Sequence, residues 1–342
     1  MGAAVNSLLL DLRKKGLYSP STKKHNKKPY LMPKTKTVTV IFARISAVII
    51  ALFLLHTQVF AAPLIEQSVI MDDGHKLTLY SRSAENPTAA ILLIHGRTWS
   101  ALPDFDLVTA QEDLSMMKAL VKQGLAVYAV DLRGYGKTPR DKSGWNTPER
   151  AAKDASMVLD YINGRHKALK GTTVFGWSNG SLVAMLTAQK YPDKVKNLLL
   201  YGFPIDTEVT FEDGPIGQIP PRKLTTAEAA AEDFIIPGTI SKEAIDAYVK
   251  ASLAADPVRA DWNRLSQWNQ LDAAKILVPT LLLQAASDPL ANMDADALFF
   301  KKLASNDKQW VILSNADHAA LLESARFRLY HAVVSFMQWS EL

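Results

Sequence analysis

The pentapeptide Gly-Trp-Ser-Asn-Gly at residues 176–180 is the segment whose residue types and spacing point most directly to chemistry. It follows an apolar run at 172–175 that predicts a strand, and it precedes a run at 181–190 that predicts a helix. Two glycines around a serine permit a tight strand-to-helix turn that exposes the hydroxyl. The pattern predicts Ser178 as a nucleophile, whereas the alternative is a serine that only caps the helix.

A serine hydroxyl is a poor nucleophile at neutral pH and needs a base, usually a histidine oriented by a carboxylate. His318 lies in the loop after the last predicted strand, at the carboxyl edge of the sheet where ligands bind in open α/β sheets. It is therefore the expected base. The remaining histidines beyond residue 62 are expected to be structural or solvated: His75, His95, His166 and His331.

Asp288 is the expected carboxylate partner of this histidine, because it directly follows the strand predicted at 280–284. The resulting chain order of serine, aspartate and histidine is the order found with nucleophile elbows of this kind. A structural turn is the other interpretation of Asp288. Three further carboxylates are kept as alternatives for the same role: Asp206, Asp294 and Asp317.

Two backbone N–H groups are needed to stabilise the oxyanion of a tetrahedral intermediate. Asn179, which follows the nucleophile at the helix N-terminus, is expected to supply one. Arg97, in the loop after the buried strand predicted at 89–94, is expected to supply the other. His95 in the same loop is expected to be structural, because His318 fills the role of the base better.

A substrate pocket rich in tryptophan is a weaker expectation, since such residues are more often core. The four tryptophans considered are Trp99, Trp177, Trp262 and Trp268. The sequence has no His-Glu-x-x-His or similar ligand spacing, so no metal site is expected. The segment at 134–136 lacks both the following glycine and the lysine of a phosphate-binding loop.

The elements that must position these residues alternate regularly along the chain. A hairpin is predicted at 69–80, followed by buried strands at 89–94, 126–130, 172–175, 197–201, 280–284 and 310–313. Helical patterns lie between them at 110–123, 148–167, 179–190, 291–303 and 319–339. This order predicts a mostly parallel sheet covered by helices. Residues 203–278 contain no convincing strand, so a helical cap is predicted at about 204–277.

Charge separates the chain into a basic prefix and an acidic body. Residues 1–61 contain ten Lys or Arg and one Asp, which leaves 29 basic and 33 acidic residues in the rest. The basic pI therefore belongs to the prefix, and the body offers no electrostatic case for binding nucleic acid. There is no cysteine, which excludes disulfides, thiolate metal sites and a cysteine nucleophile.

The apolar run at 45–55 follows Lys34, Lys36 and Arg44 and precedes small residues at 59–62. This order is typical of a signal peptide cleaved after Ala61, which predicts a periplasmic or secreted body at 62–342. The alternative is an uncleaved membrane anchor at 38–55, and membrane contact is expected only in that case. Met32 would start a signal of ordinary length, so the start codon is left open between Met1 and Met32.

These motifs together resemble the α/β-hydrolase superfamily over about residues 66–340. The resemblance is carried by His-Gly at 95–96, Asp-Leu-Arg-Gly-Tyr-Gly at 131–136, the pentapeptide at 176–180, Asp288 and His318. It implies an eight-stranded sheet with helices on both faces, a helical cap between strands six and seven, and no cofactor. It also implies that 131–136 is a structural loop. Arg97 departs from the glycine-proline run of proline iminopeptidases, and Ser178 replaces the aspartate of dehalogenases and epoxide hydrolases.

The sequence therefore predicts an exported serine hydrolase that cleaves a small or medium carboxylic ester through an acyl-enzyme. C–C bond hydrolysis or amide cleavage by the same residues is the alternative within enzymes. A non-catalytic binding module on this fold is the alternative from another class. The expected partner is a small-molecule substrate.

Overall fold

The computed structural model describes residues 62–205, 209–215 and 217–339. The fold below is that of the unit Ala61–Leu342. The predicted signal or anchor, with both possible start residues, lies outside the described residues. So does Asp206, one of the alternative carboxylates.

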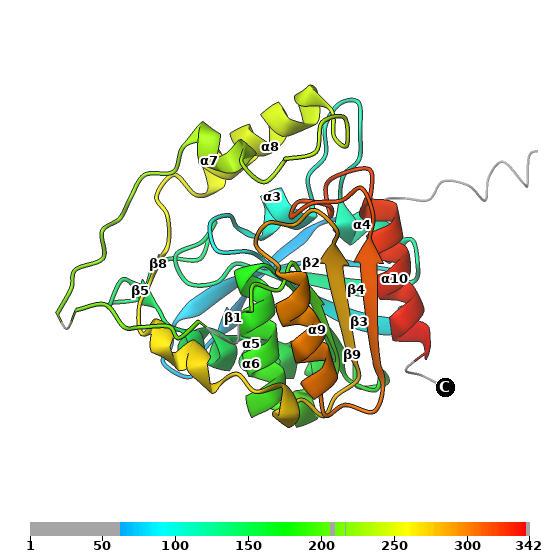
Figure 1. Cartoon of the computed structure of the whole chain (residues 1–342), viewed down its shortest axis with the longest axis horizontal. Helices are drawn as coiled ribbons and strands as arrows, with labels where there is room; N and C mark the ends of the chain where they lie inside the picture. Colours follow the sequence, from blue (N-terminus) through cyan, green and yellow to red (C-terminus); the bar gives the residue numbers. More distant parts are fainter. Residues whose placement is uncertain (1–61, 206–208, 216, 340–342) are drawn as a thin grey trace, which may run out of the picture. The chain divides into compact units, whose positions relative to one another are not determined.

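A single eight-stranded sheet forms the centre of the unit (Figure 1). Only the pairs β1–β2 and β2–β4 are antiparallel, and all other neighbours are parallel. The predicted fold class, a mostly parallel eight-stranded α/β sheet, is confirmed. In spatial order the strands are β1 (Ile65–Ile70), β2 (Lys76–Ser83), β4 (Leu125–Val130), β3 (Ala89–Ile94), β6 (Thr172–Trp177), β7 (Val195–Tyr201), β9 (Thr280–Ala285) and β10 (Lys308–Leu313).

Helices cover both faces of this sheet, which explains why β3, β4, β6 and β9 are buried at every residue. Within β3, Leu92 packs into the core on one face and Leu93 into the core on the other. The first face is covered by α5 (Pro148–Arg165), α6 (Asn179–Lys190) and α9 (Met293–Lys302). The second is covered by α3 (Ala101–Phe105), α4 (Met116–Val121) and α10 (Arg326–Trp339).

Two helices are shorter than their sequence patterns predicted. The helix expected at 110–123 begins only at Met116, because the Ser115 side chain caps it by accepting the Lys118 N–H at 2.9 Å. The helix expected at 319–339 begins at Arg326, since residues 319–325 form successive turns. A short 3₁₀ helix at Pro192–Lys194 leads into β7.

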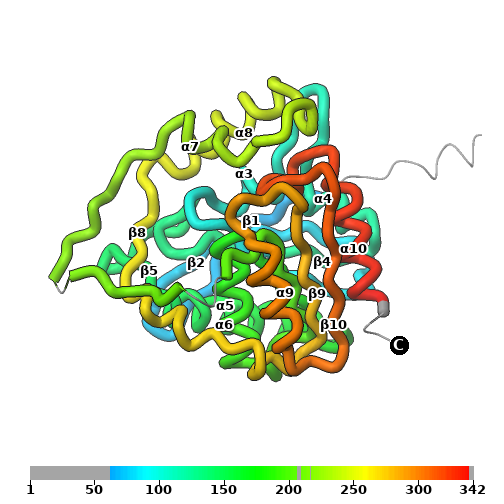
Figure 2. Tube along the Cα trace, viewed as in Figure 1, coloured from blue at the N-terminus to red at the C-terminus, as the bar shows by residue number. Residues whose placement is uncertain are grey.

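A cap lies over the carboxyl ends of the strands (Figure 1). It contains α7 (Ala227–Ala231) and α8 (Lys242–Ala255). Two 3₁₀ helices follow between the cap and β9: Leu265–Gln270 packs against α5, and Ala273–Lys275 packs against α9. Figure 2 shows two arms: one leads to α7, and the other, here called the returning arm, leads from the end of α8 through β8 (Asp261–Trp262). An isolated bridge between Leu224 and Val258 joins the two arms. In the returning arm, β8 pairs with β5 (Trp145–Asn146). A strand of two residues shows no hydrophobic alternation, so β8 could not be predicted from the sequence.

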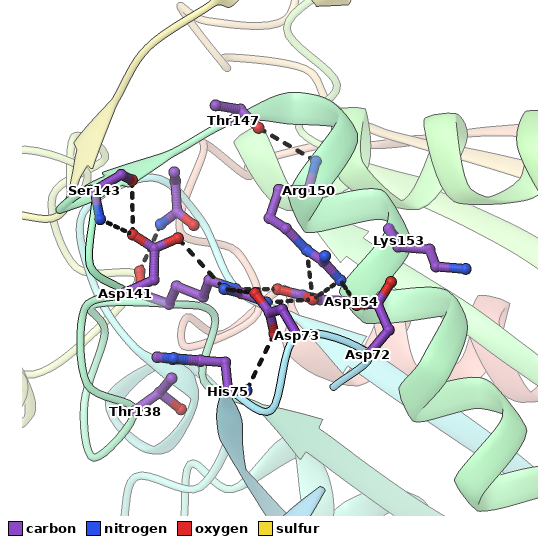
Figure 3. A network of polar contacts seen from close by, with 12 residues as sticks. Asp72, Asp73, His75, Thr138, Asp141, Ser143, Thr147, Arg150, Lys153 and Asp154 are labelled. Carbon is purple, nitrogen blue, oxygen red and sulfur yellow. Dashed lines mark hydrogen bonds and ion pairs between the residues drawn. The ribbon is translucent and has the colours of Figure 1, made fainter. Parts of the chain in front are cut away.

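The loop at 131–136 is fixed beside the sheet by a network of charges (Figure 3). The guanidinium of Arg133 contacts Asp154 at 2.6 Å and Asp73 at 2.7 Å, and its side chain is buried. Asp154 lies on α5, whose first turn is capped by Thr147. These ion pairs hold the pKa of Asp73 well below its ordinary value, the Arg133 hydrogen bond being the main cause. They join the β1–β2 hairpin, the loop and α5.

Candidate active site

Ser178 lies at the sharp turn between β6 and α6, with φ 56° and ψ −125°. A side chain seldom tolerates such a conformation, and it persists where the surrounding structure enforces it. Gly176 and Gly180 provide the space: a Cβ atom at 176 would lie 2.3 Å from the Gly180 carbonyl oxygen, and one at 180 would lie 2.3 Å from that of Ile94. Close backbone packing therefore explains both glycines of the pentapeptide.

The loops after β10 and β9 bring His318 and Asp288 together. Nδ1 of His318 lies 2.8 Å from Oδ2 of Asp288, and both side chains are buried. The other carboxylate oxygen accepts the Leu290 N–H at 2.9 Å, which fixes the orientation of Asp288. With Nδ1 donating to this carboxylate, Nε2 of a neutral imidazole is left to accept a proton. His318 and Ser178 line the same cavity.

The histidine loop is tied to the strands beneath it. The indole N–H of Trp177 donates to the carbonyl oxygen of His318 at 2.9 Å. The Tyr201 hydroxyl donates to the carbonyl oxygen of Asp317 at 2.6 Å and accepts the Ala320 N–H at 3.1 Å. Residues on β6 and β7 therefore hold His318 in place.

The other carboxylates considered from the sequence have different surroundings. Asp317 accepts the backbone N–H groups of Ile235 and Ile236 in the cap, both at 2.9 Å. Asp294 is exposed in the first turn of α9. Among the described residues, Asp288 is the carboxylate hydrogen-bonded to His318.

Two opposing effects act on the pKa of His318. Burial lowers it, but the hydrogen bond and charge of Asp288, with the charges of Asp233 and Asp317, outweigh burial and raise the pKa overall. A raised pKa makes the imidazole a stronger base. It also means that His318 is protonated in a larger fraction of the molecules at a given pH.

The expected oxyanion donors, Arg97 and Asn179, line the cavity beside Ser178. The Arg97 loop lies beside the serine, since a Cβ at 96 would be in ordinary van der Waals contact with the Ser178 Cβ, 3.6 Å away. His95 is fully buried outside the cavity lining, and its Nδ1 donates to the Gly96 carbonyl oxygen at 2.8 Å while its Nε2 accepts the Leu132 N–H at 3.1 Å. Burial lowers the pKa of His95 to about 4, so the ring is neutral.

A cavity of about 290 Å³ opens above Ser178. Trp99, Trp177 and Trp268 contribute to its wall. The structure does not bring Trp262 into the cavity lining; its ring packs against that of Trp268, with centroids 6.1 Å apart. Its indole N–H donates to the Tyr135 hydroxyl at 2.8 Å.

Besides Arg97, four charged residues that the sequence did not single out line this cavity: Asp104, Glu232, Asp233 and Arg259. Asp104 on α3 is fully buried; its Oδ1 accepts the Tyr248 hydroxyl from α8 at 3.0 Å, and no described residue donates to its Oδ2. Burial raises the pKa of Asp104 well above its ordinary value, and the nearby Asp256 and Asp233 add to this. The pocket is thus partly acidic, not simply aromatic.

Within the described ranges, no group of three or more His, Asp or Glu side chains is arranged to hold a metal ion. In the same part of the chain, the helices are too short or too polar to cross a bilayer.

The chain resembles known proteins in both sequence and structure. A family model described as serine aminopeptidase, S33, matches residues 85–325. The chain belongs to this family. Solved structures share the fold of this chain: the serine hydrolase CarC, involved in carbazole degradation, aligns with a TM-score of 0.58 at 17% identity, covering 81% of this chain and 100% of that one. A thioesterase domain from the curacin biosynthetic pathway aligns with a TM-score of 0.55 at 20% identity, covering 81% and 99%.

The S33 protein is also similar in sequence to serine hydrolase BPHL. The mouse protein (Mus musculus) is 28% identical over 227 residues, which cover 62% of this chain and 67% of the relative. The human protein (Homo sapiens) is 32% identical over 132 residues, which cover 37% of this chain and 39% of the relative. The predicted membership of the α/β hydrolases is confirmed, and the chain is a hydrolase.

Proposed function

We propose that this hydrolase cleaves a small or medium carboxylic ester, using Ser178 as nucleophile, His318 as general base and acid, and Asp288 to orient the histidine. The observation that carries the proposal is the 2.8 Å contact between His318 Nδ1 and Asp288 Oδ2, beside a cavity that Ser178 also lines. The names of the BPHL relatives agree with a serine hydrolase.

The chemistry proceeds in two halves. Nε2 of His318 takes the proton of the Ser178 hydroxyl as its oxygen attacks the ester carbonyl, and the N–H groups of Arg97 and Asn179 stabilise the oxyanion. The tetrahedral intermediate collapses to an acyl-serine, and the leaving alkoxide receives the proton from His318. His318 then takes a proton from a water molecule as the water attacks the acyl group. Collapse of this second tetrahedral intermediate releases the carboxylic acid and returns the proton from His318 to Ser178.

Replacing the nucleophile tests this proposal. Ser178→Ala should lower turnover of p-nitrophenyl esters by several orders of magnitude, with an unchanged melting temperature. Screening acyl chain lengths alongside peptides and diketones separates ester hydrolysis from amide and C–C bond cleavage. A variant that keeps more than about a tenth of wild-type turnover would exclude Ser178 as the nucleophile.

Cleavage of an amide next to a free amine is a second candidate, favoured by the acidic side of the cavity. Among the described residues, neither Asp104 nor Asp233 forms an ion pair with a lysine or arginine, and the charge of Asp233 helps to raise the pKa of Asp104. A protonated amine would match them. Alanine p-nitroanilide should then be cleaved faster than its N-acetyl form, and Asp104→Asn should abolish the difference. Equal rates, with esters cleaved faster than both, would leave the ester hydrolase.

Export remains part of the proposal and is supported by the order of charged, apolar and small residues at 34–62. Cleavage after Ala61 would release a body with a net charge near −4. N-terminal sequencing of protein from its native compartment should give a start near Ala62. A membrane-bound species starting at Met1 or Met32 would instead support the anchor at 38–55.

A further inference from the structure

We propose that Tyr135 is a positioning residue for the oxyanion hole, and that Trp262 makes this positioning depend on the cap. The proposal rests on the serine-hydrolase function above. It begins from the loop at 96–98, in which two consecutive carbonyl groups each accept a hydrogen bond from a buried side chain.

The two hydrogen bonds fix neighbouring peptide planes. Nδ1 of His95 donates to the Gly96 carbonyl oxygen at 2.8 Å, and the Tyr135 hydroxyl donates to that of Arg97. A peptide unit is planar and trans, so a carbonyl held in one direction points its N–H in the opposite one. His95 therefore orients the Arg97 N–H, while Tyr135 fixes the next plane and prevents the backbone from rotating about Arg97.

Tyr135 is itself held rigidly. Its side chain is fully buried, and its ring packs against that of His95 with centroids 4.3 Å apart. The loop that carries it is anchored by the ion pairs of Arg133 with Asp73 and Asp154. A rigid tyrosine can impose a direction on the Arg97 carbonyl, which a mobile one could not.

The returning arm of the cap completes this arrangement. Trp262 on β8 donates its indole N–H to the Tyr135 hydroxyl at 2.8 Å, which directs the hydroxyl proton toward Arg97. Asp256, at the end of α8, accepts the N–H groups of Ser100 and Gly136, both at 2.8 Å. The arm thus contacts both the segment that follows the loop at 96–98, at Ser100, and the loop that carries Tyr135, at Gly136. Displacing it would release both, so the Arg97 N–H is aligned only while the arm is docked.

Tyr135→Phe removes the hydroxyl and keeps the ring, so it tests the first claim. We expect kcat on the best p-nitrophenyl ester to fall about 10- to 100-fold, less than the loss of a whole oxyanion donor, with KM changed less than about threefold. The affinity for a trifluoromethyl ketone with the same acyl chain, which forms a tetrahedral oxyanion on Ser178, should fall by the same factor as kcat/KM.

Tyr128→Phe is the matched control, because its hydroxyl contacts His166 Nε2 at 2.7 Å, outside the cavity lining. It should leave kcat and inhibitor affinity unchanged. A purely structural role for Tyr135 would lower the melting temperature and the fraction labelled by a fluorophosphonate, with normal kcat per labelled enzyme. That result, or unchanged kcat and inhibitor affinity, would overturn the proposal.

Trp262→Phe tests the link to the cap and serves if Tyr135→Phe does not fold. It should lower kcat and inhibitor affinity in parallel, by a smaller factor than Tyr135→Phe, because the hydroxyl remains but its proton is no longer directed. Unchanged kcat in the folded variant would refute the dependence on the cap. Absence of fluorophosphonate labelling in the wild type would refute the proposed function instead, so the two failures are distinguishable.

Discussion

Gly202 is packed against His318 so closely that a Cβ atom at position 202 would lie 2.8 Å from the imidazole Cε1. The same atom would lie 3.2 Å from Asp288 Oδ2, and the glycine has φ +56°. The backbone after β7 thus forms one wall of the site that holds the histidine.

Gly202→Ala should therefore displace the histidine and reduce turnover of a p-nitrophenyl ester by at least about tenfold, which corresponds to ~1.4 kcal/mol in the barrier. Gly74→Ala is the control, because Gly74 has a similar φ of +79° but nothing within 4 Å of its Cβ position. Both variants carry the cost of positive φ, about 1 to 2 kcal/mol in unfolding free energy. Equal activity of the two variants would show that position 202 does not restrain His318.

Asp288→Asn should lower kcat on the order of 10⁴-fold, because an amide can hold the imidazole in the wrong tautomer. Asp294→Asn, an exposed change on α9, should leave kcat unchanged. Steady-state kinetics on one ester are sufficient. A mild effect at 288 together with a severe one at 206 would move the acid to the segment after β7.

The pH dependence of kcat/KM should reflect the raised pKa of His318. The base must be neutral, so activity should rise with pH through a value above that of an ordinary histidine. Asp233 contributes to raising that pKa, so Asp233→Asn should move the acid limb to lower pH. Glu232→Gln, at the neighbouring and more exposed carboxylate, should move it less. An acid limb that Asp233→Asn leaves in place, or moves upward, would contradict this account of the site.

Asp296 on α9 should make the protein less stable as pH rises. It is fully buried, no described residue donates to either carboxylate oxygen, and burial raises its pKa to about 7. The unfolded chain ionises at lower pH than the folded one, so the penalty is absent below pH ~4 and grows up to pH ~7. Asp296→Asn should raise the unfolding free energy at pH 8 by on the order of 1 to 4 kcal/mol, and by little at pH 4.

Urea denaturation at the two pH values measures this difference. Asp294→Asn again serves as the control, since its carboxylate is exposed. A stabilisation of equal size at both pH values would mean that charge is not its cause.

Local patterns were sufficient to predict much of the fold and the placement of the three central residues. Strands such as β3 and β6 are recognisable as short runs with few charges. The tight turn at 176–180 is recognisable from its two glycines, because any side chain at either position would clash with backbone atoms. Asp288 and His318 each follow a strand directly. Parallel strands end at one edge, so their positions in the chain predicted their proximity.

The contents of the cavity could not be predicted in the same way. Asp104 and Asp233 lie in short segments without a motif, and only the packing of the cap onto α3 gives both a place in the cavity wall. Trp262 was assigned to the pocket because it lies in the insertion, but pairing of β8 with β5 turns it behind Trp268. These placements depend on contacts between distant segments, which sequence spacing does not record.

Covalent labelling tests the central claim most directly. The purified protein is incubated with a fluorophosphonate, and its intact mass and the labelled peptide are measured by mass spectrometry. The account predicts one phosphonyl group per molecule, located on Ser178, and no labelling of Ser178→Ala. A folded wild-type protein that stays unlabelled, or that is labelled at another residue, would contradict it.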